Sequence, residues 1–162
     1  MSATDWEVFL RDIALCLSAY QDRGPAVVWP ERAHTVLRGL CEEYGGEAGT
    51  GWRSAPLGTR ANRLAADLSR LMGYAVDAFE HTLPAGRALA IEHRDTAVLI
   101  FSLRGGARFR IERPGSPDGE RGGIELRLRA GEIFYVPAGH TCMLDDASAD
   151  CPLLLLALHA TP

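Results

Sequence analysis

The stretch from Gly131 to Asp146, which reads GEIFYVPAGHTCMLDD, decides the fold. A short apolar run follows Gly131, and Pro137 and Gly139 end it, so we expect a strand, a tight turn and a new strand. A related stretch, Gly86 to Gly106, reads GRALAIEHRDTAVLIFSLRGG and closes on a glycine pair. A small β-barrel can bring the ends of two such hairpins together, so residues far apart in the sequence can share one site.

Short apolar or alternating runs, divided by turn residues, continue through the C-terminal half, which is typical of an all-β unit. Strands are expected at 76–81, 88–93, 97–103, 107–112, 124–128, 133–136, 141–144 and 153–159. In the strands expected at 107–112 and 124–128, apolar residues alternate with charged ones, which indicates half-buried strands. The polar segment between these two, rich in Gly, Pro and Ser, is expected to be a hairpin loop.

The N-terminal half has helical periodicity instead. Apolar residues recur every three or four positions from Trp6 to Tyr20, which predicts an amphipathic helix, and Thr4 with Glu7 is expected to form its capping box. Further elements are expected as an extended piece at 26–29, helices at about 30–44 and 59–72, and a connection at 45–58. We therefore expect a helical extension over residues 1–73, packed on a barrel over residues 74–162.

The composition limits the classes of function. The 162 residues, 47% hydrophobic and 23% charged, suit one soluble globular domain. The net charge of -4 argues against a nucleic-acid partner, and the absence of lysine excludes Schiff-base chemistry through a lysine side chain. We see no secretory opening and no apolar run long enough for a bilayer, so a cytoplasmic protein with no membrane partner is expected. Its four cysteines are then expected to be free thiols.

The stretch from Gly131 to Asp146 resembles a motif of the cupin superfamily. Gly131, Pro137 and Gly139 match its glycine, proline and glycine, whereas Cys142 occupies the histidine position and Asp146 the asparagine position. The resemblance covers about the last half of the chain. It implies a single-domain, mainly β fold, the cupin-type antiparallel β-barrel or double-stranded β-helix, with N-terminal helices added.

The stretch from Gly86 to Gly106 resembles the other cupin motif, with an H-x-D triplet formed by His93 and Asp95. Gly106 matches the closing glycine, and Leu99 occupies the glutamate position. The triplet is similar to that of the Jumonji-like oxygenases, which hold Fe(II) with two histidines and a carboxylate. Side chains two apart on a strand share a face, so His93 and Asp95 can bind one metal. The resemblance implies Fe(II) or another divalent metal there.

The third metal ligand stays open between two residues. Cys142 occupies the matching position, and His140 lies two residues before it, so either can reach inward on an extended strand. A thiolate ligand would favour zinc over an oxygenase iron. The co-substrate 2-oxoglutarate usually meets a basic residue after the glycine turn, where Ala107 stands here. Arg108 or Arg110 could take that place, because arginine binds a carboxylate bidentately.

Three functions remain open. The favoured one is a metal-dependent cupin enzyme acting on a small molecule, closest to an Fe(II) dioxygenase, with His93, Asp95 and His140 as catalytic residues. The second is a metal-free cupin that binds, isomerises or cyclises a small apolar ligand, with the same residues as acid–base groups. The third is a non-enzymatic ligand-binding or accessory protein. The resemblance also implies a homodimer, with the 6–20 helix as a contact.

The candidate residues have structural interpretations as well. His93 and Asp95 could be a hydrogen-bonded surface pair, and Cys142 a small buried hydrophobic residue. His81 and His159 are interpreted as core histidines. The tryptophans lie outside the barrel motifs and are interpreted as helix packing.

Overall fold

Residues 2–21, 23–47, 51–92, 95–112 and 123–159 are described in a computed structural model of the chain. Its helices and strands are α1 (Ala3–Tyr20), β1 (Ala26–Val28), α2 (Ala33–Glu43), β2 (Arg53–Ser54), α3 (Arg60–Met72), β3 (Ala75–Leu83), β4 (Leu89–Glu92), β5 (Ala97–Ser102), β6 (Gly106–Glu112), β7 (Ile124–Arg129), β8 (Ile133–Val136), β9 (Thr141–Asp145) and β10 (Cys151–His159). Within these described residues, no helix is long and apolar enough to cross a membrane.

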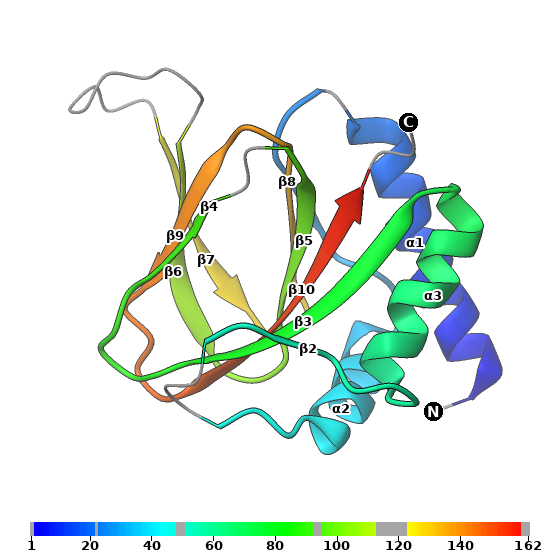
Figure 1. The fold of residues 1–162 in the computed structure, drawn as a ribbon, viewed down its shortest axis with the longest axis horizontal. Helices are drawn as coiled ribbons and strands as arrows, with labels where there is room; N and C mark the ends of the chain where they lie inside the picture. The colour runs from blue at the N-terminus through cyan, green and yellow to red at the C-terminus, as the bar shows by residue number, and fades with distance from the viewer. Residues whose placement is uncertain (1, 22, 48–50, 93–94, 113–122, 160–162) are drawn as a thin grey trace.

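The strands form two antiparallel sheets that face each other (Figure 1). The six-stranded sheet has the order β1-β8-β5-β10-β3-β2, and the four-stranded sheet has the order β4-β9-β6-β7. All eight expected strands are present. The two-residue strand β2 was not expected, because it lies in the segment interpreted as a connection. Since β1 and β2 come from the N-terminal half yet pair with barrel strands, the division of the chain at residue 73 stays a prediction.

The fold-deciding stretch forms the expected strand, turn and strand. Gly131 and Gly139 flank β8 with φ of +97° and +82°, values that residues with a Cβ rarely adopt. The chain then returns as β9, which pairs with β4 and β6. Local turn chemistry in the sequence therefore does set the course of this half of the barrel.

The space between the two sheets is a packed apolar core. Phe109 of the four-stranded sheet and Phe134 of the six-stranded sheet meet there with ring centroids 4.6 Å apart. Val98 and Ile100 of β5 lie in the same core and are fully buried. This layer is the barrel interior, and it is distinct from the packing between sheet and helices.

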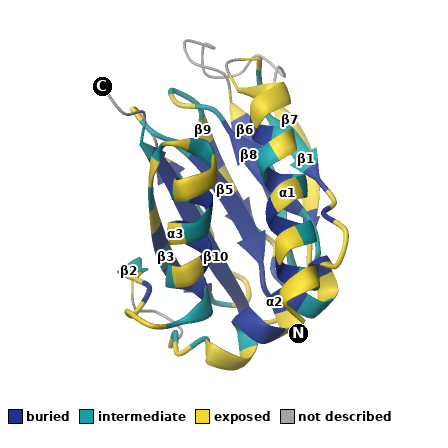
Figure 2. Ribbon diagram, turned by 90° about the vertical axis from the view of Figure 1, so that its right-hand side faces the viewer, coloured by how far each residue is buried: buried dark blue, intermediate teal, exposed yellow. Residues whose placement is uncertain are grey.

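The helices cover the outer face of the six-stranded sheet (Figures 1 and 2). The alternate residues of β5, Leu99 and Phe101, pack there against buried helix residues such as Phe9. Trp6 belongs to the same cluster, and its Nε1 donates a 2.7 Å hydrogen bond to Asp67 of α3. The apolar face of α1, expected as a dimer contact, is therefore buried within the chain.

The cap of α1 differs from the expected one. Ser2 is the N-cap: its Oγ accepts a hydrogen bond from the backbone N–H of Asp5, and the Asp5 carboxylate accepts one from the backbone N–H of Ser2. The expected capping box of Thr4 and Glu7 is wrong. Both pairs have the same three-residue spacing, and the helix uses the earlier one because α1 already begins at residue 3.

Candidate functional site at the barrel mouth

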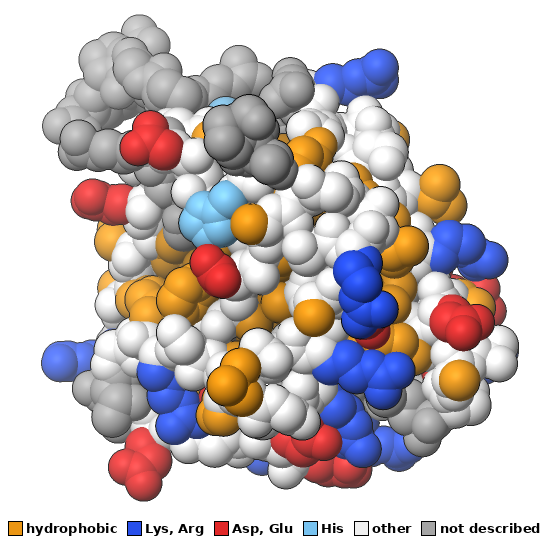
Figure 3. Space-filling view, turned by 45° about the vertical axis from the view of Figure 1, so that its right-hand side comes forward, with side chains coloured by type: hydrophobic (Ala, Val, Ile, Leu, Met, Phe, Trp, Pro, Cys, Tyr) orange, Lys and Arg blue, Asp and Glu red, His pale blue; other side chains and the backbone are white. Residues whose placement is uncertain are grey.

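The barrel interior opens at the end where β3 begins and β10 ends, and we call this opening the barrel mouth. A cavity of about 320 Å³ lies there, lined by Trp52, Phe79, Ala90, Ile91, Glu92, Thr96, Leu155, Ala157 and His159. Most of these side chains are apolar, and the polar ones are few, which is typical of small-molecule sites. Figure 3 shows hydrophobic side chains gathered beside a histidine and an acidic side chain on one face of the molecule.

A histidine–carboxylate contact lies at the barrel mouth. The pairing of β10 with β3 places Ala157 opposite Asp77, so Asp77 lies on the inward face of its strand, and His159 follows on the same face of β10. His159 Nε2 lies 3.0 Å from Asp77 Oδ2. The two side chains are 42% and 65% exposed, so solvent and a ligand can reach both. His159 was interpreted as a core histidine, and the structure corrects this.

A second histidine lies deeper on the inward face of β3. His81 is 9% exposed, and its ring centroid lies 5.0 Å from that of Trp52. Its Nδ1 is buried and has no hydrogen-bond partner. An unsatisfied buried polar atom costs roughly 1–3 kcal/mol, so such an atom needs an explanation. Trp52 packs on this ring and also lines the mouth cavity, whereas His81 is not part of the cavity lining.

Two residues close to the H-x-D triplet in the sequence line the same cavity. His93 lies outside the described residues, so its predicted role stays a prediction. Glu92 precedes it and Thr96 follows Asp95, and both line the mouth cavity.

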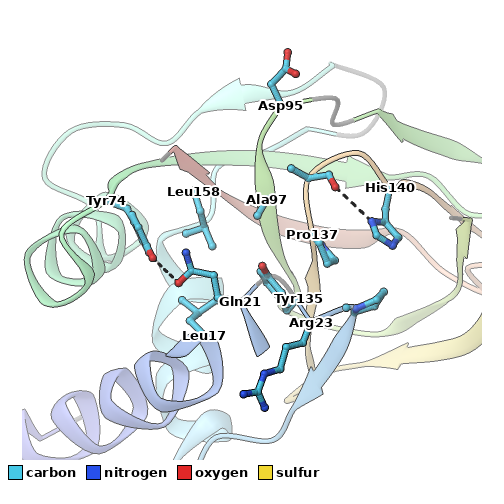
Figure 4. Close-up of a pocket in the computed structure, with 13 residues that line it drawn as sticks. Leu17, Gln21, Arg23, Tyr74, Asp95, Ala97, Tyr135, Pro137, His140 and Leu158 are labelled. Atoms are coloured by element: carbon cyan, nitrogen blue, oxygen red, sulfur yellow. Dashed lines mark hydrogen bonds between the residues drawn. The ribbon is translucent and has the colours of Figure 1, made fainter. Parts of the chain in front are cut away.

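Asp95 and His140, two of the predicted ligands, line a different cavity of about 630 Å³. This cavity lies outside the barrel, where the end of α1 meets the helix-facing side of the six-stranded sheet (Figure 4). Asp95 is exposed and points away from the other labelled side chains. His140 Nδ1 lies 3.5 Å from the backbone oxygen of Ala138. The two residues share a cavity wall, but their side chains do not converge.

Cys142 faces the barrel core. It is 4% exposed and belongs to the apolar cluster between the sheets. Its Sγ–H points to the backbone oxygen of Ile91 at 3.8 Å. Burial raises the pKa of the thiol to about 12, because desolvation disfavours the thiolate. Since the thiolate is the form that binds metals, this side chain is in the wrong state for a ligand at neutral pH.

Arg108 and Arg110 lie on the outer face of the four-stranded sheet, not in the barrel. Both bind Asp145: Arg108 donates from Nε at 2.7 Å and from Nη2 at 3.2 Å, and Arg110 donates from Nη2 at 2.5 Å. The hydrogen bond from Arg108 is the main reason that the pKa of the Asp145 carboxyl is lowered. The residues of β6 that face inward are Ala107, Phe109 and Ile111. The geometry thus gives both arginines a carboxylate partner within the chain.

The donors that the structure describes do not form a metal site among themselves. No group of three or more His, Cys, Asp or Glu side chains in the described part of the chain lies close enough to hold an ion. Asp95 points outward, and Cys142 is a protonated thiol in the core. The described residues alone therefore do not fit the metal that the sequence resemblance implies, and a site would have to include His93.

Known structures share this architecture. Pseudomonas putida prolyl-4-hydroxylase matches with a TM-score of 0.67 and 12% identity, over 93% of this chain and 100% of that one. The vicilin of Solanum melongena matches with a TM-score of 0.50 and 19% identity, over 75% of this chain and 31% of that one. The fold is a cupin-type barrel.

Other cupin-fold matches are more distant or partial. Streptomyces albus HEPD, solved with 2-hydroxyethylphosphonate and Fe(II) bound, has a TM-score of 0.43 and 18% identity, over 53% of this chain and 18% of that one. This chain thus spans less than half of the length of HEPD and of the vicilin. No protein-family profile and no curated protein sequence matches it. At these identities the likeness establishes the cupin fold alone.

Two cupin motif positions have structural roles here. Leu99, at the glutamate position, faces the helix layer rather than the barrel interior. Asp146, at the asparagine position, has φ of +53°, and its Oδ2 lies 3.6 Å from Nη1 of Arg127. Neither contributes to the barrel mouth.

Asp77 and Trp52 lie at the mouth but were not among the site residues expected from the sequence. Alternation along β3 carries a signal for Asp77, because Asp77, Phe79 and His81 share one face of the strand. No comparable signal exists for Trp52, because it is placed by the two-residue strand that follows it.

Proposed function

We propose that this chain binds a small, mostly apolar molecule in the barrel mouth and acts on it by proton transfer through His159. The observation that carries the proposal is the mouth cavity itself, whose apolar walls surround one imidazole held by one carboxylate. A volume of about 320 Å³ suits a small molecule.

The contact between His159 and Asp77 supplies the chemistry. When Nε2 of the neutral His159 ring donates its hydrogen to Asp77, Nδ1 is left with a free lone pair and can accept a proton from the ligand. Asp77 holds the ring in this tautomer and stabilises the imidazolium that forms, as carboxylates do in other histidine bases. Histidine is suited to the exchange, because it gains and loses protons near neutral pH.

Binding is tested with a hydrophobic fluorescent probe, 1-anilinonaphthalene-8-sulfonate, titrated into the full-length protein. We expect the Ala157→Leu variant, which fills the cavity, to lose binding at least tenfold, and the His159→Gln variant to bind with a changed affinity. His34→Gln is the matched control, because His34 is an exposed histidine of α2. Equal affinity in the wild type and Ala157→Leu would overturn the proposed site.

Turnover is tested separately from binding. A panel of small apolar carbonyl compounds and alcohols is incubated with the protein in deuterium oxide, and proton exchange is followed by NMR. We expect exchange that the wild type catalyses and that His159→Gln and Asp77→Asn both reduce. Binding without any exchange would make the chain a ligand-binding cupin rather than an enzyme.

A second candidate is the Fe(II) oxygenase, which the H-x-D triplet of the sequence supports. Glu92 and Thr96, which line the mouth cavity, enclose His93 and Asp95 in the sequence. In this proposal His93 and Asp95 would hold the metal with His140 or Cys142, after Asp95 had turned from its outward position, and Fe(II) would supply oxygen activation. The arginines proposed for 2-oxoglutarate, Arg108 and Arg110, would have to leave Asp145.

Metal content separates the two candidates. Protein purified without a tag under anaerobic conditions is analysed for bound metals, and Fe(II) binding is measured by calorimetry in the wild type, His93→Ala and His34→Ala. Stoichiometric binding that only His93→Ala removes, together with loss of 2-oxoglutarate or oxygen on turnover, would support the oxygenase. Unchanged metal stoichiometry in His93→Ala would remove that residue from the site.

A further inference from the structure

Within the described residues, β7 is an edge strand of the four-stranded sheet. This strand pairs with β6 on one side, and no described strand pairs with its other side. Five of its six residues are exposed. Figure 2 shows β7 at the side of the molecule where β1 and α1 also lie. An edge strand of this length presents unpaired backbone N–H and C=O groups that can pair with another strand.

Exposed apolar side chains accompany this edge. Ile124 and Leu126 are 40% and 39% exposed, although they pair with the buried Ile111 and Phe109 of β6 and so lie on the inward face of the sheet. These two side chains continue the apolar inner face of the sheet to its outermost strand. Edge strands of monomeric proteins usually carry charged residues at such positions.

The charged side chains of β7 are complementary to those of the same strand in a second copy of the chain. Glu125 and Arg127 lie on the outer face of the strand, on either side of Leu126. We propose that two copies of this chain join antiparallel through β7, with the two-fold axis at Leu126. Glu125 of each copy then lies opposite Arg127 of the second copy, and Leu126 lies opposite its own counterpart. The two sheets become one continuous eight-stranded sheet.

The register follows from the same residues. With the axis at Leu126, Ile124 lies opposite Leu128 of the second copy, so apolar residues stay together on one face. Moving the axis by one residue puts Glu125 opposite Glu125 or Arg127 opposite Arg127, and like charges directly opposite each other are destabilising. An isologous interface of this kind closes after two copies and does not propagate into a filament.

The test measures self-association of the full-length protein by sedimentation equilibrium. We expect a dimeric wild type, and we expect Glu125→Arg or Arg127→Glu alone to raise the dissociation constant at least about tenfold, because both symmetry-related pairs become repulsive. Mixing the two single variants should restore a dimer, because each heterodimer regains two opposite-charge pairs. Arg129→Glu is the matched control, since Arg129 is exposed on the same strand and lies opposite Gly123 in this register.

Thermal unfolding of each variant shows that the fold is retained. Two results would overturn the proposal. One is a wild type that stays monomeric at the highest concentration measured. The other is a dimer that withstands both single reversals, which would place the contact elsewhere, for example on the exposed Leu15 and Leu71 of α1 and α3.

Discussion

Filling the barrel mouth should stabilise the protein, whereas filling the core beside it should not. Ala157 lines the mouth cavity, and Ala157→Leu adds three carbon atoms there. Each buried methylene-sized group contributes about 0.8 kcal/mol, so complete burial of three would add roughly 2.4 kcal/mol. Because the cavity opens to solvent, we expect about half of this, roughly 1 kcal/mol, in the free energy of unfolding.

Val98 provides the matched control. It lies directly opposite Ala157 in the pairing of β5 with β10, and it is 0% exposed in the closed core. Val98→Leu adds one carbon where no space exists, and overpacking of this kind usually costs about 1–3 kcal/mol. The two substitutions enlarge neighbouring residues on one face of the same sheet. Changes of opposite sign in the free energy of unfolding would therefore isolate the effect of the cavity.

Urea unfolding followed by circular dichroism measures both changes, with the midpoint compared at an unchanged slope. In thermal unfolding, a change of 1 kcal/mol corresponds to roughly 2–4 °C for a chain of this size. A loss of stability in Ala157→Leu as large as that in Val98→Leu would refute the reasoning, because it would show that the mouth is as tightly packed as the core.

Three further predictions concern individual side chains. Cys142 should react slowly with iodoacetamide at pH 8 in the folded protein and rapidly in urea, because burial holds its pKa at about 12; a fast folded-state reaction would contradict this. The Asp145→Asn substitution should destabilise the protein at neutral pH and do so less in acid, measured by urea midpoints at several pH values. The pKa of Asp145 is lowered on folding by Arg108 and Arg110, so its contribution is present above the unfolded pKa of 3.8 and is lost as pH falls through the folded value. Gly106→Ala should lower the melting temperature by several degrees, because the added Cβ would come within 2.6 Å of a backbone oxygen of the neighbouring strand; an unchanged melting temperature would count against the close approach.

Much of the barrel could be predicted from local sequence. Pro137, Gly131 and Gly139 specify a turn chemistry that depends only on adjacent residues, and the alternation of arginine with Phe109 and Ile111 correctly assigns the faces of β6. The edge strands of the six-stranded sheet carry weaker signals. The strand at Arg53–Ser54 is two residues long, too short for an alternating pattern, and it exists only because β3 is there to pair with it.

The candidate site was harder to predict because it depends on register between distant strands. The contact of Asp77 with His159 joins residues 82 positions apart, and it follows from a pairing of β3 with β10 that no local pattern specifies. The assignment of the motif positions stays a prediction, and the environments of those side chains were not visible in the sequence. Cys142 lies in the core, and Asp145, one residue before the asparagine position, holds both arginines that were assigned to a co-substrate.

The proposed site and the proposed dimer edge should act independently, because they lie at opposite edges of the four-stranded sheet. The barrel mouth is bordered by β4 and the pairing edge is β7, with β9 and β6 between them. Substitutions that share no partners usually have additive effects, so Glu125→Arg should leave probe binding unchanged and Ala157→Leu should leave the dissociation constant of the dimer unchanged. Measuring both properties on both variants decides this. If Glu125→Arg weakened probe binding, the two ends of the sheet would be coupled, and a barrel that opens and closes with assembly would explain the site better than a preformed cavity.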